Sequence, residues 1–551
     1  MGPHDLRERW KLTGINGPGP ARVAVAAGLL CLLVHLRSLW CGFIDIDDSG
    51  YVVNNLFIRR LDWDLITAAF TESRGSFRIP LTLLSFALDY RLWGLNPLGF
   101  HLTNTLLHAA NSGLVVLIAD RLLRQRFAGV PAASRRKLLY PGVLLLAGLL
   151  FGLHPLRVES VAWVSERKDV LNGLFSFGSI LTYLTYAHKR KRGEPAVREY
   201  FIALVLFLLS LLAKSISVVI PALLLVADWY PLGRFRAERI WRLLAEKAPY
   251  LFFSVAAAAV TVSTVAQDGN LVSYREFPLA QRLLVAGNAL FEYVRLTVYP
   301  VGIVPLYVIH RPIPAAYAVK GAVVVAAAVG IFAVRRRRWI PAAALGFVIP
   351  LLPVLSLFQN GVQALAPRFT YLSSVAPSIT AAALIGLSCG KAAAAGRRRL
   401  LQGGMLLVAA LLVCWTVISV RLIETWENAG TRWTRQIELE PLGRAYRDRG
   451  FYYHQNGSLE AAYADYTAAI GIARERGWQP LYNLFAFRGA LLADLGRERE
   501  AVEDFSAAIS LFPHPSYYQG RGRALEKLGR DAEAREDFRL AGPDPPALDW
   551  F

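Results

Sequence analysis

Three carboxylates follow the first apolar stretch of the chain. Residues 21–43 are predominantly apolar, and Asp45, Asp47 and Asp48 come directly afterwards in the segment GFIDIDDSGYVVNN. A carboxylate at a membrane surface can act as a general base toward a substrate hydroxyl held at the same depth. An acid can also simply mark the end of a membrane helix. Three acids within four residues favour a chemical role.

A second group of ionisable residues lies in the segment HPLRVESVAWVSERKDVLNG, residues 154–173. Ionisable side chains at membrane depth are costly, and they are usually functional or paired. This segment is therefore either part of an active site or a network of ion pairs that orients helices. The ionisable residues that we expect to cluster in it are Glu159, Glu166, Arg167 and Asp169, with His154 and Arg157 beside them.

Polar residues also recur along one face of a helix expected near 99–122. His101, Asn104 and His108 follow the spacing i, i+3, i+7. The two histidines are about 10 Å apart along the helix axis, which is too far for one metal ion. We expect them to form hydrogen bonds into a cavity. Adjacent acids such as Asp47 and Asp48 can hold Mg²⁺ or Mn²⁺, so metal use stays open.

Single cations stand near the ends of other apolar stretches. Arg78, Lys214 and Arg368 are the candidates. Each could hold a phosphate as a point charge or as a fork of donors. Each could equally extend to the membrane surface.

The composition indicates what must position these residues. The chain has 551 residues, 54% of them hydrophobic, and a mean hydropathy of +0.36. A helix needs about 20 apolar residues to cross a bilayer. Hydropathy predicts an all-α, polytopic membrane protein with about eleven spans, at 21–43, 99–122, 138–154, 170–187, 200–213, 216–230, 249–266, 315–334, 339–358, 372–390 and 400–420.

The net charge of +20 is distributed in short basic clusters between these spans. This is typical of cytoplasmic loops, and it argues against nucleic-acid binding. All the basic clusters fall on one face if 284–310 does not cross. The N-terminus is then cytoplasmic, and the exoplasmic face receives 44–98, 155–169, 267–314, 359–371 and everything after 420. Within 44–98, the stretch 79–94 predicts a helix lying on the membrane surface.

The character of the chain changes after about Glu424, where apolar stretches end and a repeat begins. Small residues and an aromatic residue recur in register, which is the tetratricopeptide pattern of paired helices. We expect a transmembrane domain over 1–423, a linker over 424–441, and an exoplasmic α-solenoid of about three repeats over 442–551. The aligned positions are Gly450/Gly489/Gly522, Ala462/Ala501/Ala534, Tyr466/Phe505/Phe538 and Ala469/Ala508/Ala541.

Acids and cations gathered at one membrane face fit glycosyl transfer from a polyprenyl-phosphate sugar. The leaving phosphate needs cations, the acceptor hydroxyl needs a base, and the lipid tail needs a groove in the membrane.

Five motifs in order resemble the transmembrane-and-tetratricopeptide-repeat (TMTC) O-mannosyltransferases, which are GT-C glycosyltransferases. They are DIDDSGYVVNN, RIPLTLLSFALDYRLWGLNPLGFHLTNTLLHAAN, HPLRVESVAWVSERKDVL, AKSISVVIPALLLVADWYPLGR and APRFTYLS. The resemblance implies inverting transfer of a sugar, mannose in the best-understood members, to protein Ser/Thr hydroxyls.

The resemblance also implies roles for the candidate residues. Asp47 would be the base and Asp48 its support, while Asp45 would be a bystander. Arg368 and Lys214, with Arg78 and Tyr371, would face the donor phosphate or the cavity. His154, Glu159, Arg167 and Asp169 would shape the second exoplasmic loop. The repeats would present the acceptor protein. The frequent use of Arg and Ala suggests a bacterial protein, and therefore a location in the bacterial inner membrane rather than in the endoplasmic reticulum.

A non-catalytic scaffold, in which membrane-anchored repeats recruit partner proteins, is the alternative from a different class. A transporter would show inverted repeats and broken helices near mid-membrane, and the sequence has neither.

Overall fold

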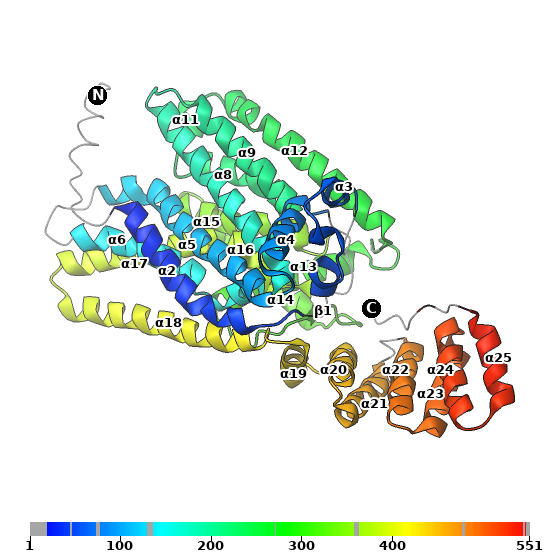
Figure 1. The fold of residues 1–551 in the computed structure, drawn as a ribbon. Coiled ribbons are helices and arrows are strands. Elements are labelled where there is room, and N and C mark those ends of the chain that lie inside the picture. The colour runs from blue at the N-terminus through cyan, green and yellow to red at the C-terminus, as the bar shows by residue number, and fades with distance from the viewer. Residues whose placement is uncertain are drawn as a thin grey trace. The chain divides into compact units, whose positions relative to one another are not determined.

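A computed structural model describes residues 19–44, 47–72, 78–128, 136–269, 271–357, 363–476, 480–543 and 546 (Figure 1). The described residues form two compact units. The first comprises the chain up to Ile303 and Tyr307–Glu427, and the second comprises Val304–Leu306 and the chain from Asn428 onward. Both units are helical, apart from one antiparallel pair of short strands in the first unit, β1 (Tyr307–Val308) and β2 (Gln363–Leu365).

The first unit contains the long apolar helices. Its α-helices are α2 (Pro20–His35), α3 (Trp63–Thr71), α4 (Pro80–Trp93), α5 (Pro97–Ala128), α6 (Arg136–Gly152), α7 (Val158–Ala162), α8 (Arg167–Lys191), α9 (Val197–Ala213), α10 (Ile220–Trp229), α11 (Arg234–Ala237), α12 (Ile240–Gln267), α13 (Leu279–Val298), α14 (Ala316–Ala333), α15 (Trp339–Val348), α16 (Thr370–Ser373), α17 (Val375–Ala394) and α18 (Arg398–Glu424). The short helices that matter below are η2 (Ser49–Val53), η4 (Pro155–Arg157), η5 (Val164–Glu166) and η8 (Pro367–Phe369).

Six helices of the described chain are long and apolar enough to cross a membrane. They are Pro20–Trp40, Pro97–Phe127, Ile240–Gln267, Ala316–Ala333, Val375–Ala394 and Arg398–Glu424. A seventh span is possible where Leu139–Gly152 and Pro155–Ala162 meet at a bend of 53°. Ser215–Trp229 and Trp339–Val354 are shorter apolar segments. The protein is therefore an all-α, multi-pass membrane protein.

Glycines bring the first membrane helices into close contact. A Cβ atom on Gly28 of α2 would lie 2.9 Å from the carbonyl oxygen of Ala109 on α5. A Cβ on Gly148 of α6 would lie 2.6 Å from Val116 of α5. Small residues at helix interfaces allow this approach, and in lipid close packing is a main source of helix association. The packing places the end of α6, and the turn that follows it, against the first half of α5.

Two further segments of the first unit, 79–94 and 284–310, can be compared with the sequence predictions. The stretch 79–94 forms α4, which begins with Pro80 in its first turn, where proline is favoured. Within 284–310, the helix α13 ends at Val298, and the described chain then continues without a helix to β1. The helix α13 is not among the six candidate spans.

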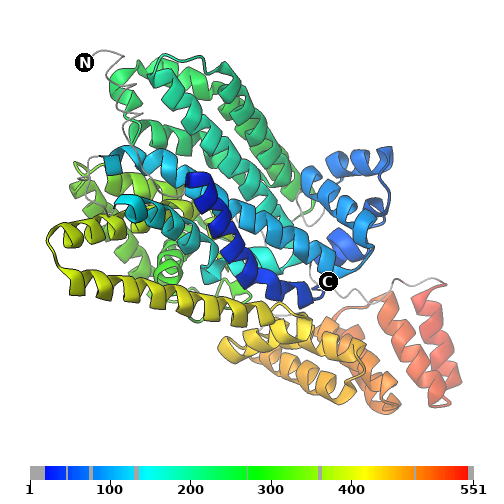
Figure 2. The same ribbon diagram turned by 60° about the vertical axis from the view of Figure 1, so that its left-hand side comes forward.

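The second unit consists of helices packed in consecutive pairs, and Figures 1 and 2 show them side by side in chain order. They are α19 (Ala429–Leu439), α20 (Gly443–Gln455), α21 (Leu459–Arg476), α22 (Leu481–Asp494), α23 (Glu498–Leu511), α24 (Pro515–Lys527) and α25 (Asp531–Ala541). The range 424–441, expected as a linker, contains α19.

One set of contacts recurs in three of these pairs. A Cβ on Gly450, Gly489 or Gly522 would lie 2.8–3.3 Å from the aromatic ring sixteen residues later, so glycine is needed there for the helices to approach. The residue before each glycine is an arginine, which pairs with an aspartate sixteen residues later. These pairs are Arg449–Asp465, Arg488–Asp504 and Arg521–Asp537, each with donor distances of 2.7–2.9 Å.

Candidate active site

Asp48 joins the first loop, which we define as residues 41–79 before α4, to the second loop, residues 153–166 between α6 and α8. Its Oδ1 accepts hydrogen bonds from the backbone N–H and the hydroxyl of Ser165, with the nitrogen 2.8 Å away. Its Oδ2 accepts from the backbone N–H of Ile44 at 2.8 Å. The side chain is fully buried, and this burial raises the pKa of Asp48 to about 7 despite the hydrogen bonds, which lower it. Asp48 therefore holds the loop after α2 against η5 and has no oxygen free for a substrate.

Asp47 points to a different partner. Its Oδ2 lies 3.3 Å from the Nζ of Lys168, at the start of α8. The side chain of Asp47 is 32% exposed, whereas that of Lys168 is 8% exposed. Lys168 also lies 3.3 Å from Oε1 of Glu166. Asp47 is thus the accessible end of a chain of charges that leads into the protein.

Glu166 is the centre of that chain. Besides Lys168, it lies within 3.4 Å of Lys214 Nζ and 3.2 Å of Arg368 Nε. Burial alone would raise the pKa of this carboxyl, but the three cations hold it well below its ordinary value. Glu166 is therefore an ionised group that fixes three cations from three separate segments.

Arg368 and Lys214 each have a second acid. Arg368, in η8, pairs with Glu159 through its guanidinium, and its backbone N–H donates to Glu159 Oε2 at 3.0 Å. Lys214, at the end of α9, pairs with Asp169, whose other oxygen accepts from Ser160 Oγ at 3.1 Å.

We call these seven side chains the ion network, namely Asp47, Glu159, Glu166, Lys168, Asp169, Lys214 and Arg368. The exposed fraction of the side chain is 32% for Asp47, 15% for Lys214 and 13% for Arg368, and it is 8% or less for the other four residues. The network thus presents one carboxylate at its edge with two partly exposed cations. A carboxylate of this kind can take a proton from a hydroxyl group, and cations of this kind can bind an anion.

Tyr371, predicted to face the donor phosphate or the cavity, forms its hydrogen bonds with residues of α5. Its hydroxyl is 2.8 Å from Nδ1 of His108, and it accepts a hydrogen bond from Asn111 Nδ2 at 2.9 Å. The other ring nitrogen of His108 lies 3.0 Å from the carbonyl oxygen of Gly152. Tyr371 and His108 are both buried and link α5, α6 and α16.

Asn104 and His101 also bind backbone groups. Asn104 Nδ2 donates to the carbonyl of Trp163 at 3.2 Å, which attaches α5 to the second loop. His101 Nε2 lies 3.3 Å from the carbonyl oxygen of Gly42 in the first loop. The three polar residues predicted on one face of α5 thus hold both loops and the end of α6 by hydrogen bonds.

Arg167 lies away from the ion network. It donates to Asp89 of α4 at 2.6 Å and to the carbonyl of Phe100 at 2.8 Å, and its Nε donates to Asn104. The structure therefore separates Arg167 from Glu159 and Asp169, with which the sequence had grouped it. Its contacts join α8 to α4 and α5.

His154 and Arg78 also lie outside the network. His154 Nε2 is 3.0 Å from the carbonyl oxygen of Thr297, and its ring packs against Trp415. Arg78 is half-buried just before α4, and none of the network carboxylates lies within ion-pair distance of it. Asp45 falls outside the described residues.

The described residues contain no group of three His, Cys, Asp or Glu side chains that could hold a metal ion. Asp47 and Asp48 diverge, since one faces Lys168 and the other is enclosed by Ser165 and Ile44. The pair therefore does not form a two-carboxylate metal site by itself.

Sequence reasoning does not identify Lys168 and Ser165 as candidates, although both lie in the segment 154–173. Successive residues on a helix point about 100° apart, so neighbours in the run ERKD must face different partners. The sequence does not say which neighbour faces which. Lys168 contacts Asp47 because of the way the first loop packs against the start of α8.

Comparison with known proteins gives one consistent set of relatives. The chain is 32% identical over 242 residues to the human protein O-mannosyl-transferase TMTC4, covering 41% of this chain and 32% of the relative. It is 28% identical over 254 residues to human TMTC1, covering 43% and 26%, and 33% identical over 176 residues to Drosophila melanogaster Tmtc2, covering 30% and 17%. No protein-family model matches the chain, and no solved structure matches it.

The matched region covers about a third or less of the length of these relatives. Thirteen curated proteins match at a significant level, and the first eight are all named protein O-mannosyl-transferases. With the ordered motifs and the multi-pass helical fold, these matches identify the chain as a distant homologue of the TMTC protein O-mannosyltransferases.

Proposed function

We propose that this protein is a membrane glycosyltransferase that transfers a sugar such as mannose from a polyprenyl-phosphate donor to Ser/Thr hydroxyls of proteins. The observation that carries the proposal is the ion network, in which the accessible carboxylate of Asp47 is joined through Lys168 and Glu166 to Arg368 and Lys214. The names of the relatives support the same class of reaction.

The proposed reaction is a single displacement with inversion. Asp47 accepts the proton of the acceptor hydroxyl while the oxygen attacks the anomeric carbon of the sugar. The bond from that carbon to the phosphate oxygen breaks, and the electron pair leaves with the phosphate. Arg368 and Lys214 stabilise the charge that develops on the phosphate. Asp48 keeps the loop of Asp47 in place and takes no part in proton transfer.

The membrane arrangement proposed here has about eleven spans, a cytoplasmic N-terminus and exoplasmic repeats. The helices α8, α9, α10 and α15 would be the additional spans, because their apolar stretches alternate with basic clusters that fall on one face. The helix pairs from Gly443 onward would be tetratricopeptide repeats that present the acceptor protein. The membrane would be a bacterial inner membrane.

The test is transfer of labelled sugar from a polyprenyl-phosphate donor to protein, measured with the purified full chain in lipid. We expect Asp47→Asn to lower the rate at least 100-fold. Asp64→Asn, an exposed acid in the first turn of α3, is the matched control and should keep full activity. Full activity of Asp47→Asn would contradict the proposal that Asp47 is the general base.

A scaffold without catalysis is the second candidate, favoured by the paired helices of the second unit. If the protein is a scaffold, deletion of 440–551 destroys its function and Asp47→Asn has no effect in cells. A comparison of glycosylated proteins between wild-type and Asp47→Asn strains separates the two candidates, and it also identifies the acceptor and the sugar.

A further inference from the structure

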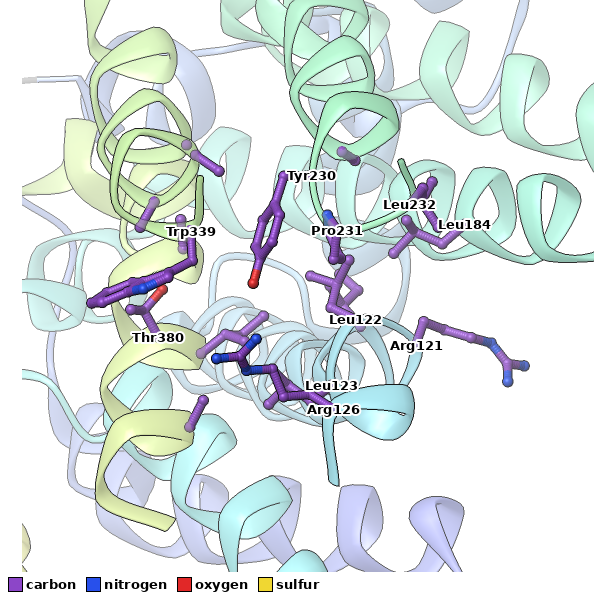
Figure 3. A pocket seen from close by; sticks show the side chains of 18 of the residues that line it. Arg121, Leu122, Leu123, Arg126, Leu184, Tyr230, Pro231, Leu232, Trp339 and Thr380 are labelled. Atoms are coloured by element: carbon purple, nitrogen blue, oxygen red, sulfur yellow. The ribbon is translucent and has the colours of Figure 1, made fainter. Parts of the chain in front are cut away.

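A large cavity lies in the first unit, away from the ion network. Its volume is about 640 Å³, and it is lined by α5, α8, α10, α15 and α17 (Figure 3). Lining residues recur every three or four positions along α17, from Val375 to Lys391. One face of that helix therefore lines the cavity over roughly 24 Å, at 1.5 Å per residue. This is most of the thickness of a hydrocarbon core.

The walls of this cavity are aliphatic, but one end is basic. Basic residues from the C-terminal turns of three helices line this end, namely Arg126 of α5, His188 and Lys191 of α8, and Lys391 of α17. The helix α8 begins at Arg167, next to the ion network, and α17 begins four residues after Tyr371. The basic end is therefore at the opposite end of these helices from Asp47.

The cations at this end have few partners. Within the described residues, no carboxylate lies within 4 Å of the charged groups of Arg126, Lys191 or Lys391. By contrast, Arg124 on the same helix pairs with Asp120 at 2.7 Å. Exposed cations beside an apolar cavity complement a ligand that has an anionic head and an apolar tail.

Figure 3 shows how one of these cations is placed. The guanidinium of Arg126 points into the cavity, and the hydroxyl of Tyr230 points toward the same part of it, whereas Arg121 points away. Tyrosine and tryptophan are enriched at the level of lipid headgroups, where one end of the ring is apolar and the other is wet. The guanidinium of Arg126 offers a fork of donors for a phosphate in the same cavity.

We propose that this cavity binds an anionic phospholipid, with its phosphate at Arg126, Lys191 and Lys391 and its acyl chain along α17. Basic pockets between membrane helices bind anionic headgroups. The sugar donor does not fill this role, because its phosphate must lie beside Asp47 for transfer. The exclusion of the sugar donor rests on the proposed function, whereas the cavity and its cations do not depend on it.

The experiment measures retained lipid by native mass spectrometry on the purified full chain. The protein is offered phosphatidylglycerol, phosphatidylcholine or polyprenyl phosphate, and thermal unfolding is followed with each lipid and with inorganic phosphate alone. The test variant is Arg126→Glu/Lys191→Glu/Lys391→Glu. The control is Arg190→Glu/Arg336→Glu/Arg399→Glu, which makes the same charge change at exposed arginines outside the cavity.

We expect the wild type and the control to retain phosphatidylglycerol at least tenfold over phosphatidylcholine, and the test variant to lose this preference. Ala383→Trp, which fills the cavity and changes no charge, should lower retention as well. Equal retention by the test and control variants would overturn the proposal. So would a full stabilising effect of inorganic phosphate alone, or Arg126-dependent retention of polyprenyl phosphate but not of phosphatidylglycerol.

Discussion

The carboxylate of Asp47 lies 3.3 Å from the ammonium group of Lys168, a residue 121 positions later in the chain. Lys168 in turn contacts Glu166, which also contacts Arg368 and Lys214. The proposed base and the proposed phosphate-binding cations therefore belong to one electrostatic unit. A substitution of one of these residues should therefore change the position or the charge environment of the others.

Lys168→Met should lower the turnover number about tenfold or more, with a smaller effect on the KM for the donor. The reason is that Lys168 orients Asp47, while the donor phosphate is proposed to contact Arg368 and Lys214. Lys168→Arg should restore part of the rate, because it keeps the charge. Initial-rate kinetics measure both constants. An increase in KM with an unchanged turnover number would contradict this role.

Folding stability should depend on pH through Asp48. Its pKa is raised by burial to about 7, from an ordinary value near 3.8. The folded state therefore binds this proton more tightly than the unfolded state, so the contribution is complete below about pH 4 and is lost as the pH rises to about 7. Thermal unfolding of wild type and Asp48→Asn across pH 4–9 measures it.

Asp48→Asn should be less stable at every pH, because its amide group cannot accept from both Ser165 and Ile44. The fall in stability between pH 4 and pH 7 should become shallower in this variant. An identical pH dependence in the two proteins would show that Asp48 does not titrate in this range.

Arg368→Met should destabilise the first unit by about 3–5 kcal/mol, because it leaves buried Glu159 without its cation. Adding Glu159→Gln to this variant should recover part of the loss, since the unpaired charge is then removed. Chemical unfolding in detergent compares the three proteins. Activity should stay low in the double variant, because the proposed phosphate contact is still missing. Recovered activity would exclude Arg368 from donor binding.

Gly522→Ala should destabilise the second unit by about 1–3 kcal/mol, because the new Cβ would lie 2.8 Å from the ring of Phe538. Gly471→Ala is the matched control, since no atom lies within 4 Å of its new Cβ on α21. That change should stabilise the unit by up to about 1 kcal/mol through helix propensity. Hydrogen exchange over 443–541 reports both effects, and equal protection in both variants would contradict the packing role of Gly522.

The sequence alone determines the class of this protein. Long apolar stretches require membrane helices, because backbone groups in lipid must be satisfied within the helix. The repeat of Gly450, Gly489 and Gly522 with an aromatic residue sixteen positions later also follows from local rules, since close helix packing needs a small residue at each site. Both features depend on residues that are near each other in the chain.

The tertiary structure decides which of the candidate residues act together. Arg167 and Lys168 are neighbours, yet one contacts Asp89 and the other Asp47. Asp47 and Asp48 are also neighbours, yet one is 32% exposed and the other is buried. Arg167 and Lys168 differ because a side chain's direction changes by about 100° with each residue of a helix. Asp47 and Asp48 differ because Lys168 meets the first, whereas Ser165 and Ile44 enclose the second. Apart from Ile44, these partners come from segments more than 70 positions away. Only the packing of those segments decides which charge meets which.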